Sequence, residues 1–157
     1  MAGKTEKHII SASAIIPARR ERVYSLLANY RDGHARILPR QFSDLVVEEG
    51  GIGGGTVIRF QMTVLGRKQN FHAAITESEP GRVLVETYLD PAGTITTFTV
   101  DPGTAPADSN VTISTEVPVR SGIRGSIEKM FATLLLRPIF RKELENLARV
   151  ATGPFAF

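Results

Sequence analysis

The side chains best suited to proton transfer in this chain are its three histidines, because the imidazole pKa lies near neutral pH. They are His8, His34 and His72, dispersed over 157 residues that include no cysteine. Only His34, with Tyr30 and Arg40 nearby in sequence, is placed to look into the entrance of a cavity; the alternative is a solvated loop residue. Dispersed histidines without cysteine predict no metal site, and no catalytic residue or cofactor is predicted.

Glycine occupies five of the six positions from Gly50 to Gly55. A phosphate-binding loop needs a following lysine and Ser/Thr and a helix whose amides face the phosphate. Here the next residues, TVIRFQMTV, alternate like a strand, so the glycines are predicted to reverse the chain tightly. A second hypothesis stays open, in which some of them, Gly53 included, form a mobile gate beside a cavity.

The elements that would position these residues are short strands and three helical segments. A first strand is predicted at residues 8–16, followed by a helix at 19–33 and a short helical turn at 34–40. Six further strands are predicted at residues 44–49, 56–64, 67–77, 82–89, 94–100 and 110–117, and a long helix from about 122 to 151. The connections between the six strands are too short for parallel crossovers, which predicts an antiparallel meander.

Alternation along these strands predicts one apolar face and one wet face. Arg59, His72 and Glu86 fall on the wet face. The polar residues expected on the apolar face are mainly Thr87, Thr96 and Thr115, which are poor groups for proton transfer. A one-residue error in register would instead turn Arg59, His72 and Tyr88 inward.

The long helix carries two apolar stripes that differ in phase by roughly 80° at 100° per residue. Pro138 lies between the stripes, so we expect a kink or break close to Arg137. The first stripe contains Ile123, Ile127, Met130, Phe131 and Leu134, and the second contains Phe140, Leu144, Leu147 and Ala151.

The order of these segments resembles the START-like (SRPBCC) superfamily with the helix-grip fold, in its polyketide cyclase/dehydrase and lipid-transport branch. The resemblance is carried by IIPARRERVYSLLANY, ILPRQFSDLVVEEGGIGGGTVIRF, ITESEPGRVLVE and LLRPIFRKELENLARVA, which together cover nearly the whole chain. It implies an α+β fold in which a seven-stranded antiparallel curved sheet wraps around a long C-terminal helix, with two short helices between strands 1 and 2. Residues 1–157 are expected to form a single such domain.

The resemblance also implies a cavity between sheet and helix for an apolar small molecule such as a lipid or polyketide. We therefore predict binding or transport of a small hydrophobic ligand without chemical change; the alternative is a cyclase or dehydratase acting in the same cavity. His34 and Gly53 are placed at the cavity entrance. The predicted lining is Phe60, Met62, Phe71, Val85, Phe98, Ile113, Thr115, Ile127, Met130, Phe131 and Leu134.

Charge and hydropathy bear on the partners. The net charge of +3 is small, and no aromatic platform accompanies the basic residues of the last helix, so no nucleic acid is expected. Two interpretations of these basic residues stay open: attraction to an anionic membrane surface, and a solvated helix face, which is the commoner explanation. No apolar stretch reaches the roughly 20 residues of a membrane span, and a cytoplasmic protein is predicted. Association into a homodimer through the segment LLLRPIF also stays open.

Overall fold

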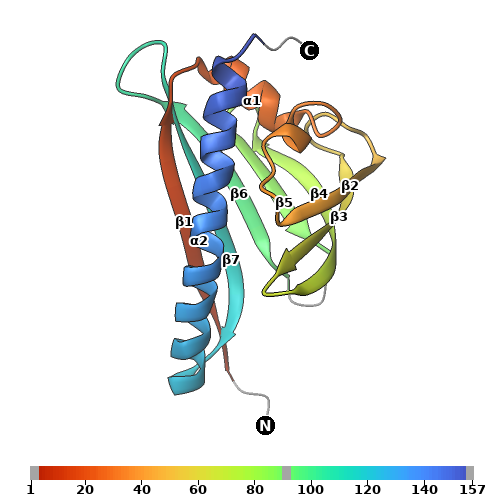
Figure 1. Ribbon diagram of the computed structural model, residues 1–157, viewed down its shortest axis with the longest axis vertical. Helices are drawn as coiled ribbons and strands as arrows, with labels where there is room; N and C mark the ends of the chain where they lie inside the picture. The colour runs from red at the N-terminus through yellow and green to blue at the C-terminus, as the bar shows by residue number, and fades with distance from the viewer. Residues whose placement is uncertain (1–3, 90–92, 155–157) are drawn as a thin grey trace.

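The computed structural model describes residues 4–89 and 93–154. In chain order its elements are β1 (Thr5–Ile16), α1 (Arg20–Ala28), η1 (His34–Arg36), β2 (Phe42–Glu49), β3 (Val57–Val64), β4 (Arg67–Glu79), β5 (Val83–Tyr88), β6 (Ile95–Pro102), β7 (Ser109–Arg120) and α2 (Gly122–Thr152). The strands form one antiparallel sheet in the order β1-β7-β6-β5-β4-β3-β2. Figure 1 shows α2 lying lengthwise over β1 and β7, which confirms the predicted helix-grip fold.

The two short helices expected between the first two strands differ in kind. The first is the α-helix α1, and the second is a single 3₁₀ turn, η1. Few residues separate Gly33 from Pro39. Pro39 also disfavours helical backbone angles at the residue before it. The segment is therefore too short for a regular α-helix, and η1 places His34 at its first position.

α2 continues from Gly122 to Thr152 with Pro138 inside it, so the helix is not broken near Arg137. Proline removes the hydrogen bond that would go to the carbonyl group four residues earlier, which belongs to Leu134. Both Leu134 and Pro138 are exposed, and solvent can therefore satisfy that carbonyl group.

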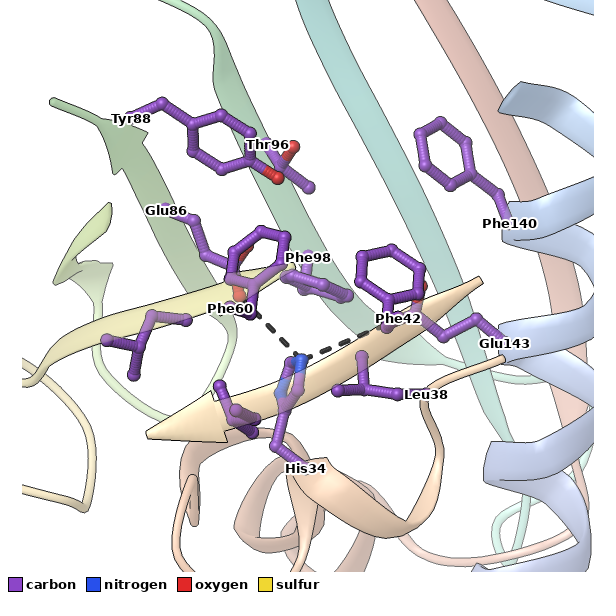
Figure 2. A pocket seen from close by; sticks show the side chains of 12 residues that line it. His34, Leu38, Phe42, Phe60, Glu86, Tyr88, Thr96, Phe98, Phe140 and Glu143 are labelled. Atoms are coloured by element: carbon purple, nitrogen blue, oxygen red, sulfur yellow. Dashed lines mark ion pairs between the residues drawn. The ribbon is translucent and has the colours of Figure 1, made fainter. Parts of the chain in front are cut away.

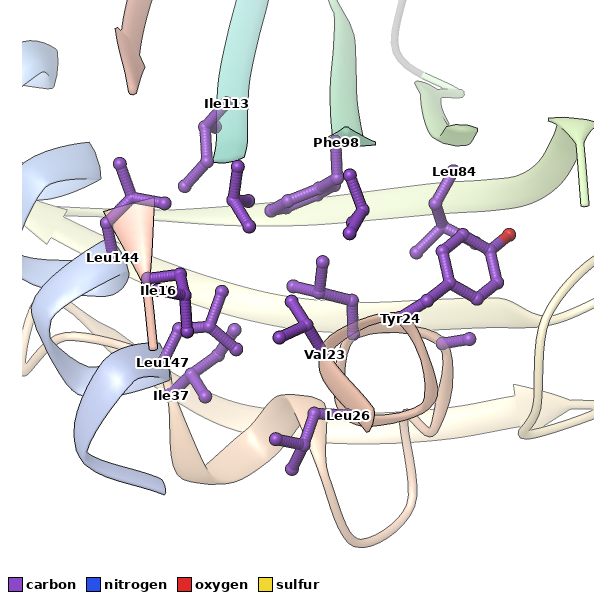
Figure 3. Close-up of a cluster of buried hydrophobic side chains, with 14 of the residues drawn as sticks. Ile16, Val23, Tyr24, Leu26, Ile37, Leu84, Phe98, Ile113, Leu144 and Leu147 are labelled. Atoms are coloured by element: carbon purple, nitrogen blue, oxygen red, sulfur yellow. The ribbon is translucent and has the colours of Figure 1, made fainter. Parts of the chain in front are cut away.

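The hydrophobic core joins the inner face of the sheet to α1 and to the second half of α2 (Figure 3). Fully burying one such leucine or isoleucine stabilises the fold by about 1.5–3 kcal/mol. The second helical stripe contributes Phe140, Leu144, Leu147 and Ala151 to this core. Its other central members are Ile16, Val23, Leu26, Ile37, Leu84, Phe98 and Ile113.

The predicted faces of β5 are wrong by one residue. Leu84 and Glu86 are buried, whereas Val83 and Val85 are only half-buried. Ile75 on β4 pairs with Glu86, and because paired residues share one face of a sheet, Glu86 lies on the same inner face as the buried Ile75. Glu86 therefore points to the inside of the sheet, where the sequence pattern had placed Val85.

Candidate functional site

A pocket lies between the inner face of the sheet, β2 and α2 (Figure 2). Its volume is about 30 Å³, which is room for about two water molecules. Most of its wall is apolar, and the polar groups gather at one place. The lining residues are His34, Leu38, Phe42, Leu45, Ile58, Phe60, Glu86, Tyr88, Thr96, Phe98, Phe140 and Glu143.

His34 is 3% exposed and is held on three sides. Its ring stacks on Tyr30 with the centroids 4.4 Å apart, and the Phe98 ring meets it edge-on at 5.4 Å. The Nδ1 atom lies 2.8 Å from the carbonyl oxygen of Leu27, which can only accept a hydrogen bond. Nδ1 is therefore the protonated nitrogen of the neutral ring, and Nε2 carries the lone pair.

Two carboxyl groups face this lone pair. Oε1 of Glu86, on β5, lies 3.7 Å from Nε2 of His34, and Oε1 of Glu143, on α2, lies 3.9 Å from it. Both distances are too long for a hydrogen bond. Figure 2 shows the three side chains converging from η1, the sheet and the helix. The Tyr30 hydroxyl donates a 2.8 Å hydrogen bond to Glu86 Oε1, which fixes that carboxyl group.

Burial sets the protonation states, because desolvation disfavours every charged form. It lowers the pKa of His34 to about 4 and raises the pKa of Glu86 to about 7. The Tyr30 hydrogen bond opposes part of the rise at Glu86. Burial, and then repulsion from Glu86, raises the pKa of Glu143 well above its ordinary value. At neutral pH the imidazole is therefore uncharged, and burial favours the protonated form of Glu143.

The arrangement places a base and an acid within one small space. Nε2 of His34 can accept a proton, and a protonated carboxyl group less than 4 Å away can donate one. Within residues 4–89 and 93–154, no group of three His, Cys, Asp or Glu side chains is arranged to hold a metal ion. The chemistry that these side chains can carry out themselves is general acid–base catalysis.

Of the predicted cavity residues on the sheet, Phe60 and Phe98 line this pocket. Ile113 is buried in the core, and Thr115 is buried with its hydroxyl 2.9 Å from that of Thr96. The others lie outside the lining: Phe71 stacks on Phe60, Val85 is half-buried, and Met62 borders a groove beside Leu135.

The predicted helical lining is wrong. Ile127, Met130, Phe131 and Leu134 are between 48 and 64% exposed and do not line the pocket. The two apolar stripes of α2 point in different directions, and an unbroken helix that buries the second stripe turns the first one outward. The helical residues that do reach the pocket are Phe140 and Glu143.

Neither predicted entrance residue lies at an entrance. His34 is deep in the pocket because its ring is bound to Leu27 and the following loop is tied to α2, where Asn146 donates a 3.0 Å hydrogen bond to the carbonyl oxygen of Ile37. Gly53 is buried against α1, with its amide donating to the carbonyl oxygen of Ala28 at 2.9 Å.

Sequence analysis missed Glu86 and Glu143 as site residues, and it placed Tyr88 inward only under a one-residue error in register. The sequence feature that could have identified Glu143 is its position between Phe140 and Leu144, on the core-facing stripe of α2. A carboxyl group on the apolar face of a helix is rarely buried unless it is paired or functional.

Replacing Gly33 with alanine should displace His34. A Cβ atom at Gly33 would lie 2.5 Å from the Leu26 carbonyl oxygen and 3.1 Å from the Leu26 Cα, which are backbone atoms that cannot rotate away. We expect the free energy of unfolding in urea to fall by about 1–3 kcal/mol. The His34 ring resonances in an NMR spectrum should shift as well.

The matched control is Gly54→Ala, because a Cβ there would meet the Glu77 side chain at an ordinary 3.5 Å. This variant should change the unfolding free energy by less than about 0.5 kcal/mol. Equal stabilities for the two variants, with unchanged His34 resonances, would show that Gly33 does not position the histidine.

A family profile described as polyketide cyclase / dehydrase and lipid transport matches residues 7–152. A search of curated proteins found no match. Among solved structures, the NMR solution structure of KanY protein superposes with a TM-score of 0.79 at 26% identity, covering 98% of this chain and 100% of that chain.

Two further solved structures share the fold at lower identity. The Zhui aromatase/cyclase from Streptomyces sp. R1128 has a TM-score of 0.75 at 14% identity, covering 93% of this chain and 94% of that one. Norcoclaurine synthase from Thalictrum flavum, in complex with dopamine and hydroxybenzaldehyde, has a TM-score of 0.74 at 14% identity, covering 98% and 91%.

Proposed function

The chain belongs to the polyketide cyclase / dehydrase and lipid transport family, and we propose that it binds a small, mainly apolar carbonyl compound and moves protons on it, as a cyclase or dehydratase does. The observation that carries this proposal is the His34 lone pair facing the Glu86 and Glu143 carboxyl groups inside an apolar pocket. A site for simple carriage has no need of three buried ionisable groups, since each costs desolvation energy. We also propose that residues 1–157 act as one domain, because the described elements share one core.

The chemistry begins with enolisation of the bound carbonyl compound. His34 Nε2 takes a proton from the carbon next to the carbonyl group, while a protonated carboxyl group gives its proton to the carbonyl oxygen. We assign that role to Glu143 because burial and repulsion from Glu86 both favour its protonated form. Bond breaking at carbon and proton gain at oxygen then occur without a net charge forming in the pocket.

Ring closure and loss of water follow from the same groups. The enol carbon forms a bond to a second carbonyl carbon of the substrate, whose oxygen takes the proton held by His34, while the enol hydroxyl group returns its proton to the carboxylate and becomes a carbonyl group again. Removal of another proton next to the new hydroxyl group, with protonation of that hydroxyl by a carboxyl group, releases water and leaves a double bond. No oxidant or reductant is consumed.

Substrate entry requires part of the wall to move, because about 30 Å³ holds no organic molecule. The segment from Leu38 to Phe42 is the part that we expect to open. It lies between this pocket, which Leu38 and Phe42 line, and an open groove of about 480 Å³, which Arg40 and Gln41 line. An apolar substrate would gain about 25 cal/mol for each Å² that it buries.

Benzylacetone, a phenyl ring joined to a methyl ketone, is a suitable probe because it has one carbonyl group on an apolar body. We expect the protein in D₂O to exchange the protons next to the ketone at least about 100-fold faster than buffer alone, measured by NMR. The matching alcohol, 4-phenyl-2-butanol, should bind without exchange. Saturable binding of both compounds without faster exchange would indicate carriage and would contradict the proposed catalysis.

A further inference from the structure

The first half of α2 presents an apolar stripe to solvent. Ile123, Ile127, Met130, Phe131 and Leu134 are between 48 and 84% exposed, and their spacing places them on one helical face. Beyond Pro138 the same outward direction carries charged residues such as Arg141 and Glu145. Single exposed apolar side chains are ordinary, but a continuous stripe of five marks a surface that binds something.

The β3–β4 hairpin adds a sixth exposed apolar residue beside the Leu134 end of this stripe. Leu65 is 78% exposed at the hairpin tip, and Figure 1 shows that tip pointing toward α2. Leu65 and Leu134 line the same groove. The φ angles of Leu65 (51°) and Gly66 (74°) are both positive, as in a two-residue turn that favours Asn-Gly. A leucine backbone is strained at a positive φ angle, and the Leu65 side chain is not buried within the chain. A contact with another molecule would explain why leucine occupies this position.

We name Leu65, Ile123, Ile127, Met130, Phe131 and Leu134 the apolar rim. Arginines surround it: Arg124, Arg137 and Arg141 lie on α2, Arg40 lines the groove, and Arg67 lines the adjoining hollow with Leu65. The nearby Lys129 and Arg120 pair with Glu6 and Glu128. In the part of the chain that the structure describes, Arg124, Arg137 and Arg141 have no carboxylate within 4.0 Å.

The positive charge of these arginines indicates which kind of partner the apolar rim can bind. A twofold dimer through the rim would bring the same surface of two copies together and place arginines close to arginines. A lipid surface rich in anionic headgroups would instead pair each arginine with a phosphate group and accept the apolar side chains between the headgroups. Among the described residues no helix is long and apolar enough to cross a membrane, so such binding would lie in the interface.

We propose that the apolar rim docks this protein on anionic lipid surfaces. The docked rim lies beside the segment from Leu38 to Phe42, because the groove between Leu65 and Leu134 is also lined by Arg40 and Gln41. An apolar molecule could then pass between lipid and pocket with little exposure to water. Docking itself does not depend on the chemistry of His34, so it can fail or succeed independently of the proposed catalysis.

The test is sedimentation of the full chain with vesicles of phosphatidylcholine alone and with vesicles containing about 30% phosphatidylglycerol. We expect binding to the anionic vesicles to be at least about tenfold tighter, and to weaken as salt is raised. The variant Leu65→Asn/Phe131→Gln should bind them at least about tenfold more weakly. Asparagine suits the turn at position 65, and glutamine suits an exposed helix, so both changes should leave the fold intact.

The control variant is Ile9→Thr. Ile9 is 57% exposed, close to the 54% of Phe131, but it lies on the face of β1 opposite to its buried neighbour Ile10. It should bind anionic vesicles as the unchanged chain does. No binding of the unchanged chain would overturn the proposal, as would equal losses in the rim and control variants. A dimer in size-exclusion chromatography that the rim variant dissociates, without vesicle binding, would identify a second copy as the occupant.

Discussion

Replacing Glu86 with glutamine should stabilise the fold at alkaline pH by about 3 kcal/mol relative to its effect near pH 4.5. The pKa of Glu86 is raised from an ordinary 4.5 to about 7. Between these values the unfolded chain has lost the proton that the folded chain keeps, so stability falls as pH rises. Glutamine does not ionise, and its side-chain oxygen can still accept the hydrogen bond from Tyr30.

The measurement is the free energy of unfolding in urea at pH 4.5, 6 and 8 for both proteins. His34 acts in the opposite direction, because its lowered pKa of about 4 removes stability as pH falls from 6.5 toward 4. Comparing the variant with the parent at each pH largely cancels that contribution.

Glu77→Gln is the matched control. Glu77 also accepts a tyrosine hydrogen bond, from Tyr24 at 2.7 Å, but it is only half-buried. Its substitution alters a tyrosine–carboxyl hydrogen bond outside the pocket and so controls for the change in that bond alone. A constant difference for Glu86→Gln across the three pH values would contradict an assignment of raised pKa to Glu86.

Much of the fold followed from sequence because the strands obey simple alternation. Ile58 and Phe60 on β3, Ala73 and Ile75 on β4, and Phe98 on β6 all face the core as their spacing predicted. Each of these strands alternates one apolar residue with one polar or small residue, so only one face can be buried. The turns between them carry glycine or proline, which indicated where each strand ends.

On β5 the alternation of apolar and polar residues did not indicate which face of the strand is buried. Val83, Leu84 and Val85 are all apolar, so either phase buries two or more apolar side chains of the strand. The charge of Glu86 then favoured the phase that exposes it, which is the general rule for carboxyl groups. The structure departs from this rule at the pocket, and a departure of this kind is expected at functional sites.

The position of His34 could not come from sequence patterns. It lies in a 3₁₀ turn whose direction is fixed by distant contacts: the Leu27 carbonyl, the Tyr30 ring and the Asn146 bond to Ile37. None of these has a periodic signature. The meeting of His34 with Glu143 likewise depends on how a continuous α2 crosses the sheet, whereas the sequence predicted a kink or break close to Arg137.

The buried cluster places opposite demands on stability and on chemistry. Its three ionisable groups lie in a pocket whose other walls include Phe60, Phe98 and Phe140. Each pKa is therefore shifted in the direction that favours the neutral form: the pKa of the histidine is lowered, and the pKa values of both carboxyl groups are raised. The neutral forms are the ones that enolisation needs: an unprotonated imidazole beside a protonated carboxyl group. The desolvation that weakens the fold therefore prepares the catalyst.

Replacing His34 with asparagine should lower kcat/KM for proton exchange of benzylacetone by about 100- to 1000-fold while KM changes little. The asparagine amide can take the place of Nδ1 and donate to the Leu27 carbonyl, so the 2.8 Å bond that orients the residue is retained. The group that disappears is Nε2, the base itself. Exchange rates by NMR and thermal melting of the same samples separate loss of chemistry from loss of fold.

Added imidazole distinguishes the role of His34 as a base from a structural one. The ring removed from beside Tyr30 leaves space for a free imidazole, and neutral imidazole can supply the missing lone pair next to Glu86 and Glu143. Exchange by the asparagine variant should therefore rise with imidazole concentration and saturate. The parent protein should show no such rise. A variant that melts normally and still exchanges protons at the parent's rate would show that the proton acceptor is another group, and Glu86→Gln would then be the next variant to assay.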